Sequence, residues 1–387
     1  MKRSAERILV THAGSLPRPD GLRALVAAKT SGQPYDAAAL AERLRAAVAE
    51  TVQQQAAAGV DVVNDGELSK SNFLFYVRER LGGCAEQPPT LPSTATAGIS
   101  GRDARDFPEY FATDSGRRQI GATLAQKRVS AVEPLRYVGQ AAIQTDLDNF
   151  RAALQGVAVE EAFLPAVAPG SIEHWLGNAY YPTHEAFLFG IADAMREEYQ
   201  AIVGAGFLLQ IDDPGLADSW QMHPDMDVAA YRQLAALHVA ALNHALRDVP
   251  PDRVRFHMCW GSYHGPHKHD IPLRHIVDLI LQVRAEAYSI EASNAAHEHE
   301  WRVWEDVKLP EGKILIPGVA GHASDFVEHP ELIAERLVRY ARLVGRENVM
   351  AGTDCGLGER VGHPSLVWAK FQAMAEGARL ATKQLWG

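Results

Sequence analysis

Short runs of β-branched and other apolar residues alternate along the chain with longer segments of helical periodicity. The apolar runs predict eight strands, at Ile8–His12, Val60–Asp65, Ala162–Ala168, Phe207–Asp212, Val254–Cys259, Ala287–Glu291, Lys313–Val319 and Asn348–Asp354. The helical spacing predicts helices at Asp36–Ala58, His184–Val203, Tyr231–Asp248, Leu273–Glu286, Pro330–Val344 and Leu366–Gln384. Such alternation is typical of parallel βα units. We therefore predict an α/β fold, a single (β/α)8 TIM barrel, whose functional residues lie on the loops after the strands.

One stretch, about residues 82–156, interrupts this alternation between the second and third βα units. It contains a Pro/Thr/Ser-rich segment at Gln87–Thr96, an Arg/Asp-rich segment at Gly101–Phe107 and a strand-like run at Leu135–Gln144. We predict an insertion here. A hairpin or lid over the barrel mouth and a surface elaboration without a catalytic role are equally compatible with it. With this insertion, residues 1–387 form one catalytic barrel domain.

Composition narrows the class of protein. The chain has 387 residues, of which 47% are hydrophobic and 22% charged, as in ordinary globular proteins. A net charge of -10 argues against nucleic acid or an anionic membrane as the main partner. No apolar run approaches the length of a membrane span, and three cysteines are too few for a disulfide framework. We expect a cytoplasmic protein, and the sequence leaves open whether it is a homo-oligomer.

Four residues that suit a soft metal stand where predicted strands end. His257 and Cys259 close one strand, Glu291 closes the next, and Cys355 closes the last. Residues two apart in a strand face the same side, so His257 and Cys259 can both face the barrel interior. Two thiolates, an imidazole and a carboxylate suit zinc better than a harder cation. We predict a catalytic zinc site that activates a thiol; the alternative is a buried cysteine pair with a hydrogen-bonded histidine.

Other polar residues also follow the predicted strands. Carboxylates at Glu67, Asp212, Asp213 and Asp218 would suit recognition of a substrate amine or supply of a proton. His12 and Arg18 are candidates to meet an anionic group of the substrate. His322 is a candidate general acid, with Asp218 as a second candidate. The histidine-rich loops at 263–270 and 297–301 are more typical of solvated or substrate-pocket loops than of a second metal site.

Several of these motifs resemble the cobalamin-independent methionine synthase family, and in particular its C-terminal catalytic barrel. The motifs are Thr11–Pro19, Asp65-Gly66-Glu67, Gln210–Pro214, His257-Met258-Cys259 and Thr353–Gly356, in the family's order along nearly the whole chain. The resemblance implies that His257, Cys259, Glu291 and Cys355 are zinc ligands. It also implies that Ser15, Glu67 and Asp212 bind an amino-acid thiol, and that Trp175 lies beside a folate site. His322 stands one position from the place of the family's catalytic histidine.

The resemblance indicates the thiol chemistry more specifically than it indicates the substrates. We expect a zinc-dependent methyltransferase in which homocysteine or another small thiol accepts a methyl group from a methylfolate or another donor. The single-barrel branch of the family also includes epoxyalkane:coenzyme M transferases, so addition of a thiol to an epoxide is the alternative within the same chemistry. A metal-free lyase similar to uroporphyrinogen decarboxylase is the alternative from another enzyme class, and a non-enzymatic metal-storage or thiol-binding module is the third.

Overall fold

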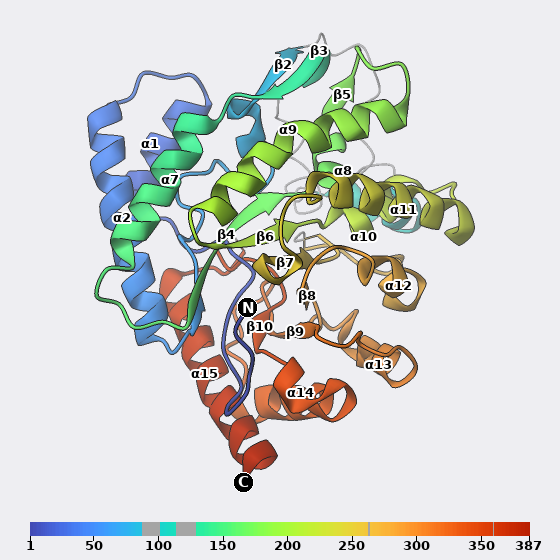
Figure 1. Cartoon of the computed structure of the whole chain (residues 1–387). Coiled ribbons are helices and arrows are strands. Elements are labelled where there is room, and N and C mark those ends of the chain that lie inside the picture. Colours follow the sequence, from blue (N-terminus) through green and yellow to red (C-terminus); the bar gives the residue numbers. More distant parts are fainter. Residues whose placement is uncertain (87–100, 114–128, 262–263, 359) are drawn as a thin grey trace.

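A curled parallel sheet forms the centre of the protein, and helices cover its outer face (Figure 1). The computed structural model describes residues 1–86, 101–113, 129–261, 264–358 and 360–387. The sheet has the order β1-β4-β6-β7-β8-β9-β10, and every neighbouring pair is parallel. Its strands are β1 (Val62–Val63), β4 (Glu161–Val167), β6 (Leu208–Asp212), β7 (Val254–Met258), β8 (Ala287–Ile290), β9 (Ile314–Ala320) and β10 (Gly352–Thr353).

The segment around Val10 joins the two edges of this sheet. The Val10 carbonyl accepts hydrogen bonds from the amides of Asp61 (2.8 Å) and Val62 (3.1 Å), next to and in β1. On its other side, Thr11 donates to the Ala351 carbonyl and the Ala351 amide donates to Leu9, both at 2.8 Å. The curled sheet with this linking segment is consistent with a TIM-like barrel. Each of the seven strands contains residues of a predicted strand, and the segment around Val10 is the predicted first one.

Several helices begin after a residue whose side chain accepts hydrogen bonds from the first free amides. The Asp36 carboxylate accepts from the amides of Ala38 and Ala39, and the Asp227 carboxylate from that of Ala230. The helices are α1 (Asp20–Thr30), α2 (Ala37–Ala57), α4 (Arg102–Asp106), α5 (Pro108–Ala112), α7 (Gln140–Ala153), α8 (Pro169–Glu173), α9 (His184–Gly204), α10 (Gly215–Met222), α11 (Val228–Ala245), α12 (Val277–Ile280), α13 (Val303–Asp306), α14 (Pro330–Val344) and α15 (Pro364–Trp386). Short 3-10 helices lie at η1 (Phe75–Glu79), η3 (Pro251–Arg253), η4 (Leu273–His275), η5 (Glu298–Arg302) and η6 (Arg346–Asn348).

The predicted helix Leu273–Glu286 is wrong in extent. In its place stand η4 and the single turn of α12, and residues 281–286 are not helical. The reason is a competing set of hydrogen bonds: the Tyr288 hydroxyl donates to the carbonyls of Leu281 and Val283. Residues 281–286 therefore reach β8 as a loop in which Val283 and Ala285 are buried.

A small second sheet stands at one end of the molecule (Figure 1). It has the order β2-β3-β5, with β2 (Leu81–Glu86) antiparallel to β3 (Val129–Tyr137) and β5 (Leu176–Asn178) parallel to β3. The small sheet therefore contains β5, which follows β4 in the chain, as well as strands from the predicted insertion at about residues 82–156. Within that stretch, α7 packs against α2 and α9 in the helix layer. Residues 87–100 and 114–128 of the predicted insertion lie outside the described residues.

Candidate metal and substrate site

Three of the four predicted metal ligands converge at the carboxyl ends of the strands. His257 is the fourth residue of β7, Cys259 follows that strand, and Cys355 lies two residues after β10. One ligand atom from each lies within 4.8 Å of the others, and the two sulfur atoms are 3.6 Å apart. His257 and Cys259 are buried, and Cys355 is partly exposed.

The donor atoms of this cluster fit a soft cation. The Nε2 atom of His257 is buried without a hydrogen-bond partner in the described part of the chain. Its Nδ1 atom lies 3.3 Å from the Ser289 hydroxyl, which fixes the plane of the ring. A buried imidazole nitrogen without a partner costs free energy. One nitrogen and two sulfurs around a common point are the donor set that zinc prefers.

Glu291, the fourth predicted ligand, lies beside this cluster and has its own partners. Its carboxylate accepts hydrogen bonds from the Trp260 amide (2.9 Å) and from the Asn294 side chain (3.0 Å). His322 and Asp354 each place one ligand atom within 4.8 Å of the Glu291 carboxylate. The structure thus brings Glu291 to the same rim but groups it separately from the two sulfurs.

Asp354 connects the loops that carry Glu291 and Cys355. Its carboxylate accepts hydrogen bonds from the amides of Ala292 and Ser293, both at 2.8 Å, and from the Ser293 hydroxyl at 2.6 Å. Burial raises the pKa of Asp354, and these hydrogen bonds oppose that rise. Because Asp354 precedes Cys355 and its partners follow Glu291, it fixes the spacing of two predicted ligands.

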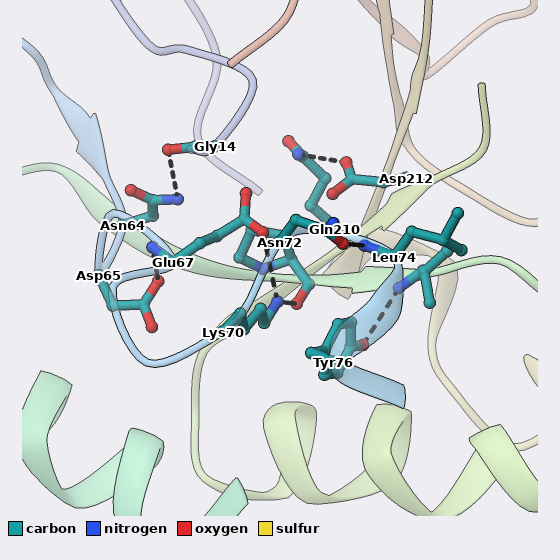
Figure 2. A network of polar contacts seen from close by, with 12 residues as sticks. Gly14, Asn64, Asp65, Glu67, Lys70, Asn72, Leu74, Tyr76, Gln210 and Asp212 are labelled. Carbon is teal, nitrogen blue, oxygen red and sulfur yellow. Dashed lines mark hydrogen bonds and ion pairs between the residues drawn. The ribbon is translucent and has the colours of Figure 1, made fainter. Parts of the chain in front are cut away.

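A second cluster, of acidic and basic groups, lies after β1 and at the end of β6 (Figure 2). Glu67 and Asp212 are both buried, and the charge of Glu67 contributes, after burial, to raising the pKa of Asp212 well above its usual value. The Lys70 ammonium lies 3.7 Å from Glu67 and donates to the Pro165 carbonyl at 2.6 Å. We call Glu67, Lys70 and Asp212 the acidic pocket.

Glu67 is held in a strained backbone conformation. Its φ of 56° lies in the left-handed region, which residues other than glycine rarely adopt. The Arg18 guanidinium supports this loop by donating to the carbonyls of Glu67, Leu68 and Lys70. Gly14 faces the carboxylate: a Cβ atom at Gly14 would lie 2.6 Å from Glu67 Oε1. Strain of this kind is often found at ligand-binding positions.

The remaining predicted substrate residues take different positions. Both ring nitrogens of buried His12 have partners inside the protein, Nε2 with Gln55 at 2.8 Å and Nδ1 with the Gly14 amide at 3.2 Å. The Ser15 carbonyl accepts from the Leu357 amide at 2.8 Å, so the loops carrying Ser15 and Cys355 lie together. Trp175 packs edge-on against Phe75, with ring centroids 5.6 Å apart, in an apolar recess beside the small sheet.

The two predicted proton donors differ in charge state. Burial lowers the pKa of His322 to about 3, so its imidazole is neutral at pH 7, and neither ring nitrogen has a hydrogen-bond partner in the described part of the chain. Burial, with a further contribution from Asp270, raises the pKa of Asp218 to about 7. A Cβ atom at Gly261 would lie 3.5 Å from the Asp218 carboxyl carbon, which places Asp218 beside the loop after Cys259. At neutral pH Asp218 is therefore the better proton donor of the two.

The histidine-rich loops form a hydrogen-bonded chain next to this rim. Asp270 accepts from His267 (2.6 Å) and His297 (3.1 Å), and His297 also contacts Glu300 (3.0 Å). The His297 ring stacks on Trp260, with centroids 3.7 Å apart. Burial acts to lower the pKa of His297, but the carboxylates of Asp270 and Glu300 raise it to about 9. The loops thus fix the residue that follows Cys259.

Two residues that the sequence patterns did not single out, Lys70 and Asn294, contact Glu67 and Glu291 respectively. Each stands three residues after its partner, in the loop that follows a strand. A polar residue at that distance from a strand-end carboxylate is the signal that would have found both.

Comparisons with known proteins place this geometry in context. The family model described as the catalytic domain of cobalamin-independent synthase matches residues 181–379, slightly more than half of the chain. A methionine synthase of Thermococcus kodakarensis is 22% identical over 376 residues, covering 96% of this chain and 93% of its own.

Two solved structures show the same fold over nearly their whole length. A B12-independent methionine synthase from Shewanella sp. W3-18-1, in complex with selenomethionine, matches with a TM-score of 0.74 and 19% identity, covering 98% of this chain and 99% of that chain. A putative vitamin-B12 independent methionine synthase from Listeria monocytogenes matches with a TM-score of 0.66 and 16% identity, with the same coverage.

None of the described helices is long and apolar enough to cross a membrane.

Proposed function

The chain belongs to the cobalamin-independent methionine synthase family, and from this premise we propose that it is a zinc-dependent enzyme that transfers a methyl group to a small thiol. The observation that carries the proposal is the cluster of His257, Cys259 and Cys355, in which three soft donor atoms from two distant strand ends lie within 4.8 Å. The acceptor we favour is homocysteine, because the neighbouring acidic pocket suits an amino acid.

His257, Cys259 and Cys355 would hold the metal, and Glu291 would complete the set. Bound there, zinc would lower the pKa of a substrate thiol, so that the thiol is deprotonated near neutral pH. The unpartnered Nε2 atom of His257 supports this assignment, because a metal would satisfy it. The hydrogen bonds of Glu291 to Trp260 and Asn294 make it the most readily displaced of the four, which suits a position that a substrate thiol takes over.

The acidic pocket would bind the ammonium group of the amino-acid thiol. Burial and the charge of Glu67 disfavour ionisation of Asp212, and the single Lys70 ammonium offsets only part of this effect. A substrate ammonium would therefore be attracted as a second cation. Ser15 and Arg18 would act around it: Ser15 lies beside the loop of Cys355, and Arg18 fixes the backbone of Glu67. His12 would support the pocket from beneath, since its nitrogens are used internally.

Proton transfer would be divided between Asp218 and His322. With a pKa of about 7, Asp218 is half protonated at neutrality and can donate a proton to the demethylated donor. His322 is buried and neutral, so it suits a hydrogen bond as a neutral imidazole near Glu291 rather than donation as an imidazolium. Trp175, on the apolar recess with Phe75, would pack against the ring of a methylfolate or another flat donor.

We further propose that the segment Ile8–His12, the first predicted strand, joins the seven strands of the sheet to close a (β/α)8 barrel, and that residues 1–387 act as one catalytic domain. The hydrogen bonds of Val10 to β1, and of its neighbours to Ala351 before β10, support closure. The small sheet β2-β3-β5 would border the donor site, because Trp175 and Leu176 line the recess beside it. We expect the enzyme to act in the cytoplasm.

Metal analysis and X-ray absorption spectroscopy test the proposal. We expect one zinc per chain bound by sulfur in the wild type, and loss of that zinc in a Cys355→Ser variant. The matched control is Cys84→Ser, because Cys84 is a half-buried cysteine in β2, outside the cluster. Addition of homocysteine should add one sulfur to the zinc shell. An unchanged shell in the presence of every thiol tested would refute thiol activation.

A substrate screen then separates methyl transfer from its alternatives. Homocysteine, glutathione and coenzyme M are each combined with methyltetrahydrofolate and with an epoxyalkane, and the products are measured by mass spectrometry. We expect methylation of homocysteine. Thioether formation from coenzyme M and an epoxide would identify the alternative transferase, and zinc without turnover would identify a storage protein. Decarboxylation of a porphyrinogen by zinc-free protein would identify the lyase.

A further inference from the structure

A second group of metal-ligating side chains lies in the helix layer, apart from the cysteine cluster. Glu173 ends α8, His184 begins α9, and His238 lies within α11. One ligand atom from each lies within 4.8 Å of the others. These three helices pack against one another (Figure 1). Residues separated by 11 and 54 positions in sequence thus meet at one point on the outside of the sheet.

The two histidines share one carboxylate. Glu173 Oε2 lies 2.6 Å from His184 Nε2, and Glu173 Oε1 lies 2.7 Å from His238 Nε2. Both imidazole Nε2 atoms therefore point at the same group. No lysine or arginine forms a salt bridge with Glu173 among the described residues. Although burial acts to raise it, the hydrogen bonds from the two histidines hold the pKa of Glu173 below its usual value.

Two of the three side chains are largely buried, and the third is open to solvent. The side chains of His238 and Glu173 are 1% and 10% exposed, whereas that of His184 is 47% exposed. An ion could therefore reach the group from solvent past His184. His223, the residue after α10, is half-buried, and its pKa, lowered mainly by burial, also responds to the charges of Glu173, His238 and His184. A further imidazole thus lies within electrostatic reach.

We propose that Glu173, His184 and His238 form a structural binding site for a divalent first-row cation such as zinc. Two imidazoles and a carboxylate are a common ligand set for such ions, and the remaining positions would hold water. Donor atoms around tetrahedral zinc lie about 3.3 Å apart. The two contacts between Glu173 and the imidazoles, now 2.6 and 2.7 Å, would therefore need to lengthen by less than about 1 Å. The ion replaces the protons that the imidazoles share with Glu173 and cross-links α8, α9 and α11. Because Trp175 follows α8 closely, the site also anchors the loop that carries it.

Zinc titration of the full-length protein tests this site separately from the thiol chemistry. The titration uses a Cys259→Ser/Cys355→Ser background, in which the cysteine cluster has lost its sulfur ligands, and counts bound zinc by calorimetry and mass spectrometry. We expect one zinc per chain to remain, with only nitrogen and oxygen ligands in its X-ray absorption spectrum. Introducing the His184→Ala substitution into this background should weaken zinc binding at least about tenfold. Circular dichroism verifies that each variant is folded.

His244→Ala in the same background is the matched control. His244 also lies on α11 and contacts a carboxylate on α9, Asp193, at 2.8 Å, but that carboxylate holds Arg247 in place of a second imidazole. We expect zinc binding to be unchanged. A folded background variant that binds no zinc, or zinc binding that His184→Ala leaves intact, would overturn the proposal and leave an ion-pair cluster. If the background variant does not fold, wild type must bind two zinc ions and His184→Ala one.

Discussion

Replacement of Glu198 by glutamine tests whether a buried carboxylate holds the protein together beneath the acidic pocket. Glu198 is fully buried on α9. Its carboxylate accepts hydrogen bonds from the hydroxyls of Tyr76 (2.7 Å) and Tyr137 (2.6 Å), and from the Arg80 guanidinium at 3.0 Å. Arg80 also pairs with Asp146. The network links η1, β3, α7 and α9, and the Lys70 ammonium lies 4.5 Å from the centre of the Tyr76 ring.

The expected loss follows from these contacts. Three hydrogen bonds to a charged group, at about 1.5–3 kcal/mol each, amount to at most about 9 kcal/mol if they were independent. They are not independent, because glutamine keeps one acceptor oxygen and Arg80 keeps Asp146. Breaking a buried ion pair from one side usually costs about 3–5 kcal/mol. We therefore expect Glu198→Gln to lower the free energy of unfolding by about 3–5 kcal/mol.

The effect should also depend on pH. Burial acts to raise the pKa of Glu198, but Arg80 and Lys70 hold it below its usual value. A lowered pKa in the folded state stabilises the protein above the unfolded-state value of about 4.3, and this stabilisation is lost as the pH falls through the folded-state value. The difference between wild type and Glu198→Gln should therefore be full at pH 7 and shrink only in acid.

Urea unfolding measures the difference, with circular dichroism and tryptophan fluorescence recorded together. The two signals must change at the same urea concentrations for a free energy to be calculated. Glu376→Gln is the control: Glu376 forms an exposed pair with Arg379, so its loss should leave the unfolding midpoint unchanged. A loss below about 1 kcal/mol in Glu198→Gln would show that the charge of this carboxylate contributes little.

Three further predictions concern the proposed site. Glu67→Gln or Asp212→Asn should each weaken binding of methionine by about tenfold or more in calorimetry, because each removes a carboxyl group that the bound ammonium would hold in its ionised form; unchanged affinity would place the amino group elsewhere. The kcat/KM of the wild type should fall as the pH rises through about 7, where Asp218 loses its proton, and Asp218→Asn should remove this limb of the profile. Gly14→Ala should weaken methionine binding and leave the zinc content unchanged, because its new Cβ atom would press on the Glu67 carboxylate.

Periodicity predicted the main framework because strand and helix patterns are local properties. Every strand of the large sheet falls on a predicted run, and α14 has the predicted bounds Pro330–Val344. The helix predicted at Leu273–Glu286 failed because a side chain outside that segment, Tyr288, satisfies the carbonyls that a helix would have used. The third strand of the small sheet, β5, was also missed, because it joins β3 across about 40 residues and its three residues are too few for a periodic signal.

By itself, the sequence determined which side chains stand at strand ends and on which face. His257 and Cys259 share a face because alternation in a strand is a property of the backbone. Only the tertiary structure decided distances between loops: it brought Cys259 and Cys355 to 3.6 Å across 96 residues, and it turned Glu291 toward Trp260 and Asn294. It also assembled Glu173, His184 and His238 from three helices. Such meetings depend on how the sheet curls and the helices pack, which no local pattern encodes.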